Sequence, residues 1–545
     1  MWPWKTKEEF VEFEKASLVA TDFIPLAYIT DSEKRKVEIA GTNTMKHGIF
    51  VVSPEKGKYE VSDRIETSFQ VDYLGAIDLL KDGRREYVVF TKTPSGFDIN
   101  IASISGKSRF IGESECMPFL VSHEGLNPVL FTQNSGNTYF IDLVKEKTEA
   151  SSTNFGILRE NHSSGFVDVS GDGIPEIVLD TLQEEGRVIE VWKRDEKEEY
   201  ALVNTVGIPV EAGPFVFGDF TGSGSVDILF LSNDPPAINV VPNRRLPYCT
   251  HSIRGNCLHK KNMMEETSPY GYAENSTISY PVHSVSEFIL SNESGPVFPS
   301  VLDINSNTYP DVLAVAKEED DDSPQPRLFL NTNGDGFVPE SVFSEISGSI
   351  NRVSFYRQDK GVWNVLASCE ENATSSLYMY PNVSDISGYY ISIMTKMQRE
   401  STVSPIVGAC HACRITETGR VVVGFHPAQS GYASLQSPIV NLGLGSTNVF
   451  IGSLQSRVPC RSYSVGKTFD KIVPNSELLI EISGNKPIEH SLYLNTSAYW
   501  PVAIPIMLTI LFVLGITSAY FSVKARKVSK HAVQRTRYNA PFGAL

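Results

Sequence analysis

The sequence lacks the short motifs that mark the commonest catalytic sites. It contains no G-x-S-x-G turn, no phosphate-binding loop and no H-E-x-x-H pair. Its ten histidines are scattered, and His411, between Cys410 and Cys413, is interpreted as a loop residue rather than a catalytic base. We therefore expect a protein that is not an enzyme, and a catalytic centre assembled from residues distant in the sequence stays an alternative.

Acidic residues are absent from the last 22 residues, which carry six basic ones. The rest of the chain holds 42 basic and 64 acidic residues, a net charge of −22. Such a balance excludes nucleic acid as a partner of the main body, because phosphates attract basic surfaces. The charge pattern therefore separates a large acidic body from a short basic end.

Long apolar runs are absent except for residues 498–523, which contain no Asp, Glu, Lys or Arg. These 26 residues can span the roughly 30 Å hydrocarbon layer as a helix. A buried core helix is the alternative, and the basic flank argues against it. We predict one transmembrane helix at 498–523 and a basic cytoplasmic tail at 524–545. The body then lies outside the cell or in a lumen, because positive flanks stay in the cytoplasm.

The first fifteen residues are charged and lack the apolar core of a signal peptide. Insertion by the C-terminal helix alone is one explanation. It would leave the body in the cytosol, where the glycosylation sequons of the body have no use. We therefore expect a leader that this sequence does not include.

Cysteines are few and odd in number, seven in all. We predict disulfides between Cys249 and Cys257 and between Cys410 and Cys413, with a C-x-x-C zinc site as the weaker reading of the second pair. Glycosylation is expected at the sequon asparagines, which are Asn161, Asn275, Asn292, Asn372, Asn382 and Asn495.

Oxygen-bearing side chains alternate in the stretch from Phe166 to Thr181. A glycine at the sixth position of this loop allows a sharp turn, and β-branched residues on both sides indicate strands. Alternating oxygens and a closing carboxylate are the ligands that Ca²⁺ prefers. The bidentate Glu of an EF-hand is missing, since Leu179 stands there. The predicted ligands are Asp168, Ser170, Asp172, Ile174 (through its backbone) and Glu176.

The same offsets recur elsewhere, which indicates a repeat. Three further loops are predicted to bind Ca²⁺ in a structural role, with Leu80 and Thr308 as departures from the pattern. Their expected ligands are Asp78, Asp82 and Glu86, then Asp219, Thr221, Ser223 and Asp227, and finally Asp303, Asn305, Asn307 and Asp311. Weaker copies near residues 30, 123 and 356 keep the strands and lose the ligands.

Seven such units of about four strands each predict an all-β fold, a seven-bladed β-propeller at 1–402. An insertion interrupts it at about 240–290, and the segment Phe10 to Asp22 is expected to complete the ring. The repeat stops near residue 403. Strand-like runs separated by Gly and Pro turns predict a small membrane-proximal β-sandwich at 403–497.

The repeats resemble the FG-GAP repeats of integrin α-subunits, in the loop pattern and in the run Phe217-Gly218-Asp219. The whole chain is similar to the T-cell immunomodulatory protein (linkin) family of single-pass membrane proteins, notably in residues 435–454. The resemblance implies a calcium-stabilised propeller that acts as a protein-interaction or cell-adhesion module, with a protein or glycan partner bound at the propeller loops. Two alternatives stay open: a secretory-pathway escort or assembly factor in an internal membrane, and a propeller-type hydrolase.

Overall fold

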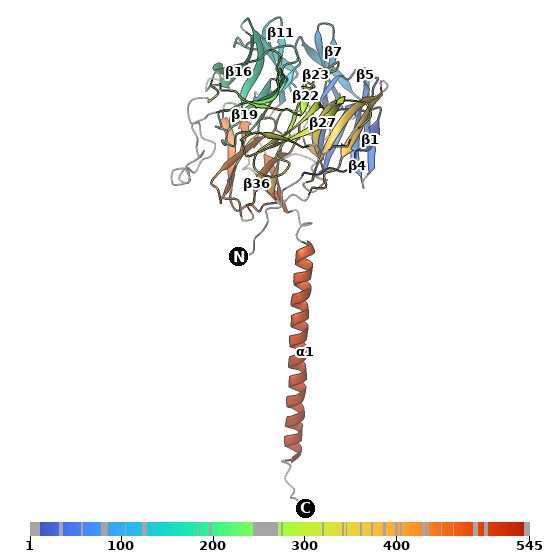
Figure 1. Cartoon of the computed structure of the whole chain (residues 1–545), viewed down its shortest axis with the longest axis vertical. Coiled ribbons are helices and arrows are strands. Elements are labelled where there is room, and N and C mark those ends of the chain that lie inside the picture. The colour runs from blue at the N-terminus through green and yellow to red at the C-terminus, as the bar shows by residue number, and fades with distance from the viewer. Residues whose placement is uncertain are drawn as a thin grey trace, which may run out of the picture. The chain divides into compact units, whose positions relative to one another are not determined.

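The computed structural model describes residues 11–538 apart from internal gaps. It forms two compact units, Met1–Tyr493 and Leu494–Leu545, which are considered separately. Figure 1 labels the main strands of the first unit and the single helix of the second. The gaps are 32–35, 56–57, 78–85, 104, 123–127, 185, 196–198, 244–270, 274–275, 319–320, 341–342, 345, 360–361, 372–373, 385–387, 398–401, 404–405, 428–431, 433–434, 448–449, 461–462, 483–488 and 495–499.

Seven antiparallel sheets follow one another through the first part of the described chain. The first three contain, in order, β2 (Ile24–Asp31), β3 (Lys36–Thr42), β4 (His47–Glu55) and β5 (Lys58–Gln70); β6 (Tyr73–Ile77), β7 (Glu86–Thr93), β8 (Gly96–Ser103) and β9 (Ser108–Ser114); and β10 (Phe119–Ser122), β11 (Pro128–Asn134), β12 (Asn137–Asp142) and β13 (Lys147–Ala150). Each has the order of a meander, because its consecutive strands are neighbours.

The fourth to sixth sheets carry the acidic loops. They contain β14 (Gly165–Val167), β15 (Glu176–Gln183), β16 (Gly186–Arg194) and β17 (Tyr200–Ile208); β18 (Phe215–Gly218), β19 (Asp227–Asn233), β20 (Pro236–Val241) and β21 (Ile278–Pro281); and β22 (Val285–Phe288), β25 (Ser300–Leu302), β26 (Asp311–Glu318), β27 (Asp321–Asn331) and β28 (Phe337–Glu340). A small hairpin, β23 (Ser291–Asn292) with β24 (Gly295–Pro296), precedes β25. The insertion predicted at about 240–290 overlaps the connection between β20 and β21, but it ends before β21, since β21 and β22 are strands of the fifth and sixth sheets.

The seventh sheet joins the two ends of this region. It consists of β29 (Ser349–Asp359), β30 (Val362–Glu371), β31 (Thr374–Tyr380) and β1 (Ser17–Thr21). Strand β1 comes from the segment that was predicted to complete the ring, and it pairs antiparallel with β31. A second link is β33 (Thr402–Val403), which pairs with β2.

Alternating faces of these strands build separate cores. In β15, Ile177 and Leu179 pack into the cluster shared with the third sheet, whereas Val178 packs into the cluster shared with the fifth. Successive side chains of a strand point to opposite faces, so one apolar run serves two neighbours. The clusters join sheets one and two, two and three, three and four, four and five, and five and six. A further cluster joins the sixth, seventh and first sheets.

Two four-stranded sheets follow and enclose one apolar core, with Ile393, Cys413 and Leu454 among its members. One has the order β36 (Val440–Gly445), β32 (Tyr389–Met397), β39 (Ser476–Ile482) and β40 (Glu489–Leu494); the other has β35 (Val421–Phe425), β34 (Cys410–Arg414), β37 (Ser453–Cys460) and β38 (Tyr463–Phe469). We call this two-sheet region the sandwich. Strand β32 precedes residue 403, so the sandwich begins earlier in the chain than predicted, and β33 belongs to the first sheet.

The second unit is one helix, α1 (Trp500–Tyr538). Residues 504–531 of α1 include an 18-residue window with a mean hydropathy of 2.1, and the helix is long and apolar enough to cross a membrane. The helix continues fifteen residues beyond the predicted boundary at residue 523, so most of the basic tail is helical. Lys, Arg and Gln are good helix formers, which explains why the helix does not stop where the apolar run ends.

A buried ion pair ties the fourth sheet to the segment before the fifth. Arg187 on β16 bonds both carboxylate oxygens of Asp180 on β15 at 2.8 Å, and neither side chain is exposed. The same guanidinium donates to the backbone oxygens of Ala212 and Gly213. Removing one partner of such a pair leaves an uncompensated charge in the interior.

We predict that Arg187→Met destabilises the first unit by about 3–5 kcal/mol, because Asp180 stays buried without its counter-ion. Arg64→Met is the matched control, since Arg64 is exposed and its pairing with Glu66 contributes about 0–1 kcal/mol. Thermal unfolding of the two variants measures the difference. Equal melting temperatures for both variants would contradict this role of the pair.

Candidate functional site: three acidic loops beneath the sandwich

The loop from Asp168 to Glu176 joins the first two strands of the fourth sheet. Asp168 accepts backbone hydrogen bonds from Gly171 at 2.5 Å and from Gly173 at 2.8 Å. Both glycines have positive φ, 72° and 83°. This left-handed conformation favours glycine, so the sequence explains the local turn. Ile174, expected as a backbone ligand, donates its N–H to Asp172 at 2.8 Å.

Three carboxylates of this loop meet. Ligand oxygens of Asp168, Asp172 and Glu176 lie within 4.8 Å of one another. Glu176 is fully buried, and its Oε1 has no hydrogen-bond partner. Burial, followed by the charges of Asp168 and Asp172, raises the pKa of Glu176 well above its ordinary value. Lys193 pairs with Asp172 at 2.8 Å and offsets only part of this charge.

The loop of the fifth sheet repeats this arrangement with fewer carboxylates. Asp219 accepts from Gly224 at 3.0 Å, and Asp227 accepts from both the N–H and the hydroxyl of Thr221. Buried Asp219 Oδ1 and Ser223 Oγ have no partner. Burial raises the pKa of Asp219 to about 6, and burial together with the charge of Asp219 raises the pKa of Asp227 to about 8.

The loop of the sixth sheet keeps the same backbone although Thr308 replaces the glycine. Thr308 has a φ of 83°, equal to that of Gly173. Its N–H donates to Asp303 at 2.7 Å, and the N–H of Ile304 donates to Asp311 at 2.9 Å. Burial raises the pKa of Asp303 to about 7, and burial with Asp303 raises the pKa of Asp311 well above its ordinary value. The amide oxygens of Asn305 and Asn307 accept hydrogen bonds from backbone N–H groups inside the loop.

The three loops are therefore equivalent in conformation as well as in sequence offset. In each, the first aspartate accepts from the backbone N–H five residues later, and the closing acid accepts from an N–H near the start of the loop. Each predicted side-chain ligand would bind a metal through an oxygen atom, and hard cations prefer oxygen ligands. In the fourth predicted loop, Asp78 and Asp82 lie outside the described residues. Glu86 is buried at the start of β7.

The sandwich covers these loops, a feature that the sequence patterns did not indicate. Arg457 of β37 donates to the backbone oxygen of Asp172. Arg420, just before β35, donates to the hydroxyl and backbone oxygen of Thr308, and its guanidinium carbon lies 3.6 Å from the ring centroid of Tyr309. Arginine combines stacking with fixed donors, which suits it to such contacts. Isolated arginines in a β-rich sequence carry no spacing signal that would have identified them.

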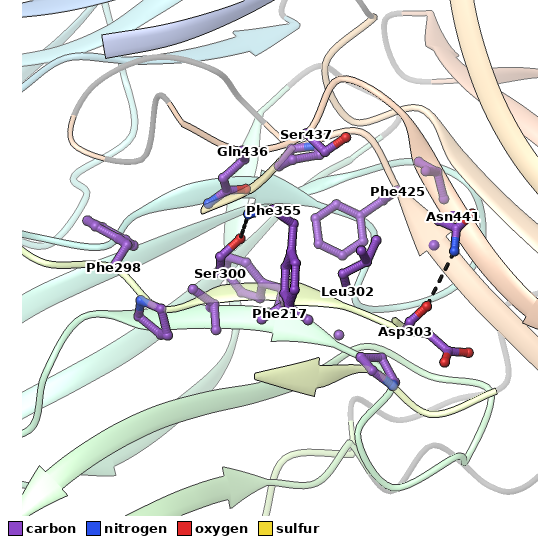
Figure 2. A pocket seen from close by; sticks show the side chains of 18 of the residues that line it. Phe217, Phe298, Ser300, Leu302, Asp303, Phe355, Phe425, Gln436, Ser437 and Asn441 are labelled. Carbon is purple, nitrogen blue, oxygen red and sulfur yellow. Dashed lines mark hydrogen bonds between the residues drawn. The ribbon is translucent and has the colours of Figure 1, made fainter. Parts of the chain in front are cut away.

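The third loop also packs against the sandwich. Asn441 of β36 donates to the backbone oxygen of Asp303 at 3.4 Å (Figure 2). The N–H of Gly445 donates to the oxygen of Ser306 at 2.8 Å. A Cβ at Gly443 would lie 1.8 Å from Asp303 Oδ2, so no other residue fits there without displacement.

The predicted Cys410–Cys413 disulfide is wrong, because both are free thiols in the structure. They lie three residues apart in strand β34, where side chains alternate, so their thiols point to opposite sides. Cys413 is part of the sandwich core, and the Cys410 thiol donates to Asp168 Oδ2 at 3.4 Å. His411 is buried between Thr395 and Ser456 in a strand rather than in a loop.

The remaining predicted residues are only partly described. Cys249 and Cys257 lie outside the described residues, as do the sequon residues Asn275, Asn372 and Asn495. Asn161, Asn292 and Asn382 are partly buried. The side-chain amide of Asn292 donates to the backbone oxygen of Asn351 at 3.1 Å. The side-chain oxygen of Asn382 accepts a hydrogen bond from the N–H of Ser384.

Comparison with known proteins shows which family the chain resembles. Residues 402–492 match the family model described as "ITFG1, C2 domain", a range that holds every strand of the sandwich except β32 and the end of β40. Over 424 residues the chain is 23% identical to the T-cell immunomodulatory protein homolog of Plasmodium falciparum (isolate 3D7), across 65% of this chain and 58% of that protein. The chain is similar to the T-cell immunomodulatory protein family.

A second member of the T-cell immunomodulatory protein family, the homolog of Plasmodium yoelii yoelii, is 20% identical over 391 residues, across 60% of this chain and 55% of that protein. The chain thus spans less than two thirds of the length of these curated relatives. A functionally unknown protein from Desulfotomaculum acetoxidans DSM 771, solved by crystallography, matches with 13% identity over 60% of this chain and 84% of its own. Its TM-score of 0.34 supports no inference about fold or function.

We predict that Gly443→Ala loosens the sandwich from the third loop, because the added methyl collides with the Asp303 carboxylate. Overpacking of this kind costs about 1–3 kcal/mol. Gly207→Ala is the matched control, since it lies within strand β17 and a Cβ there meets nothing within 4 Å. Thermal melts and limited proteolysis measure the effect. A Gly443→Ala protein with the same melting temperature as the control would disprove this close packing.

Proposed function

We propose that the seven sheets form a seven-bladed β-propeller of FG-GAP type, which together with the sandwich makes up the non-cytoplasmic part of a single-pass membrane glycoprotein. Two observations support the ring. Each apolar cluster is shared by consecutive sheets, and one cluster joins the sixth, seventh and first. Strand β1, from the start of the chain, completes the seventh sheet. Closure of this kind removes exposed sheet edges.

Ca²⁺ is the ion that the ligands of the three acidic loops suit best. Asp168, Asp219 and Asp303 lead loops of one conformation, and buried oxygens of Glu176, Asp219 and Ser223 lack a protein partner. A divalent cation would satisfy these oxygens and cancel the repulsion between buried carboxylates. Its role is structural: it would hold each loop in the shape that Arg420, Arg457 and Asn441 contact.

Attachment to a membrane is the main support for a role in protein interaction or cell adhesion. The apolar part of α1 before residue 524 can span a bilayer, and the six basic residues that follow residue 523 mark the cytoplasmic side. The relatives are named T-cell immunomodulatory protein homologs. We take the body to be a protein-interaction or cell-adhesion module rather than an enzyme.

The partner would meet the end of the propeller that the sandwich leaves free. In a four-stranded antiparallel meander, the turn between the second and third strands lies at the end opposite the turn between the first and second. The sandwich contacts first-to-second turns, those that start at Asp168, Asp219 and Asp303. Leu182, near the end of β15, is exposed, as is Met45 between β3 and β4. These exposed apolar side chains support that end as the binding face.

Removal of calcium is expected to lower the melting temperature of the full-length protein, because an ion that binds only the folded state stabilises it. Extracellular sites of this type have Kd values of roughly 10⁻⁴ to 10⁻³ M, so millimolar calcium is compared with chelator. Asp219→Asn should reduce the calcium-dependent shift, whereas Asp335→Asn, at an exposed aspartate, should not. A melting temperature that the chelator leaves unchanged would show that calcium does not stabilise the fold.

The proposed topology predicts N-linked glycans on the body. In cells that express the protein, Asn161→Gln should remove one glycan-sized mass step that an N-glycosidase also removes. Asn154→Gln, at an exposed asparagine outside any sequon, should leave the mass pattern unchanged.

An impermeant amine reagent on intact cells should label lysines of the body. Labelling of the tail lysines instead would show the opposite orientation, and no labelling before permeabilisation would favour the escort alternative.

A further inference from the structure

A cavity of about 160 Å³ lies where the propeller sheets meet the sandwich. Figure 2 shows its wall, with Phe217, Leu302 and Phe355 from the sheets facing Phe425 of the sandwich strand β35. Phe298 lies at one side of this view, and Asp303 with Asn441 at the other. Most of the lining is apolar or aromatic, as in small-molecule sites at domain boundaries.

Arg352 of β29 is the only Lys or Arg side chain in the described lining. It is mostly buried and makes one hydrogen bond, to the backbone oxygen of Pro25 at 3.3 Å. No carboxylate among the described residues forms an ion pair with it. A guanidinium has five N–H donors, so most of those on Arg352 have no acceptor among the described residues. The side chain is partly exposed, so these donors are available to a partner that enters the cavity.

The two acidic groups of the lining do not supply that partner. Asp219 and Asp303 belong to the acidic loops, where backbone N–H groups hold them. The cation whose charge acts on both is Arg420. Arg352 instead lies near the phenol of Tyr73, whose ring packs edge-on against Tyr432 at 5.2 Å. The cavity therefore has a cationic end beside Tyr432 and an acidic end at the loops.

Three other polar side chains of the described wall, those of Ser300, Ser437 and Asn441, make hydrogen bonds within the protein. Ser300 Oγ accepts from the N–H of Phe355 at 3.2 Å, and Asn441 donates to Asp303 (Figure 2). Ser437 Oγ donates to the backbone oxygen of Ile439 at 3.0 Å. Among the polar side chains of this wall, the guanidinium is therefore the group with donors to spare.

We propose that this cavity binds a small monocarboxylic acid with a compact apolar body, its carboxylate held by Arg352 and its body packed among Phe217, Phe298, Phe355 and Phe425. The volume fits, because an apolar cavity of about 150 Å³ accommodates benzene. A planar guanidinium matches the two oxygens of a carboxylate. A dicarboxylate is disfavoured, since its second charge would approach Asp219 and Asp303.

Binding of 3-phenylpropionate to the full-length protein in lipid nanodiscs tests this site. The neutral isostere 3-phenylpropanamide, which has the same apolar body, is the ligand control. Titration calorimetry should give a Kd for the acid in the millimolar range or below, and the amide should bind at least tenfold more weakly, because it lacks the charge that pairs with Arg352. The acid should also raise the melting temperature more than the amide does.

Variants assign the effect to the guanidinium. Arg352→Gln should weaken binding of the acid about tenfold or more and abolish the difference between acid and amide. Arg352→Lys, which keeps the charge, should retain the preference for the acid. Arg64→Gln makes the same charge change at an exposed arginine and should bind like the parent protein.

Three results would overturn the proposal. The first is equal affinity of the parent protein for acid and amide. The second is the absence of saturable binding in the millimolar range. The third is an Arg352→Gln protein that binds the acid as the parent does. The acid–amide comparison uses the unmodified protein, so it decides the question even where a variant fails to fold.

Discussion

Burial of acidic loops at a packed boundary is the constraint on which the rest of this structure depends. Asp168, Asp219 and Asp303 each lead a loop whose carboxylates are withdrawn from water, and the sandwich covers all three. Buried carboxylates repel one another and lose hydration, so such an arrangement needs compensating charge. The protein supplies part of it through Lys193 and Arg420, and through backbone N–H groups.

The seven sheets and the sandwich lie in one compact unit, and this boundary is where they pack together. Arg357 of the seventh sheet pairs with Glu477 of the sandwich, a link far from the loops in the sequence. The same boundary encloses the cavity with Arg352, so loop geometry and cavity shape depend on one interface. Asp219 and Asp303 belong both to the acidic loops and to the cavity wall, so a displacement of these loops would change the lining of the cavity.

Much of the fold could be predicted from the sequence because its repeats are local. Turn glycines such as Gly173 and short apolar runs such as 177–179 specify a hairpin within a dozen residues. The approach of the sandwich to the loops could not be predicted, since Arg420, Arg457 and Gly443 act through contacts between distant segments. The free thiols of Cys410 and Cys413 show the same limit: C-x-x-C suggests a bridge only until the strand around it is known.

Hydrogen–deuterium exchange at the loop amides tests the central claim most directly. The N–H groups of Gly173, Gly224 and Thr308 bond the leading aspartates of the three loops. If the loops and the sandwich depend on one another, chelation of calcium should raise exchange at all three amides and in strands β34 and β36 together. Loop amides that exchange faster while those strands keep their protection, or no change anywhere, would contradict the account.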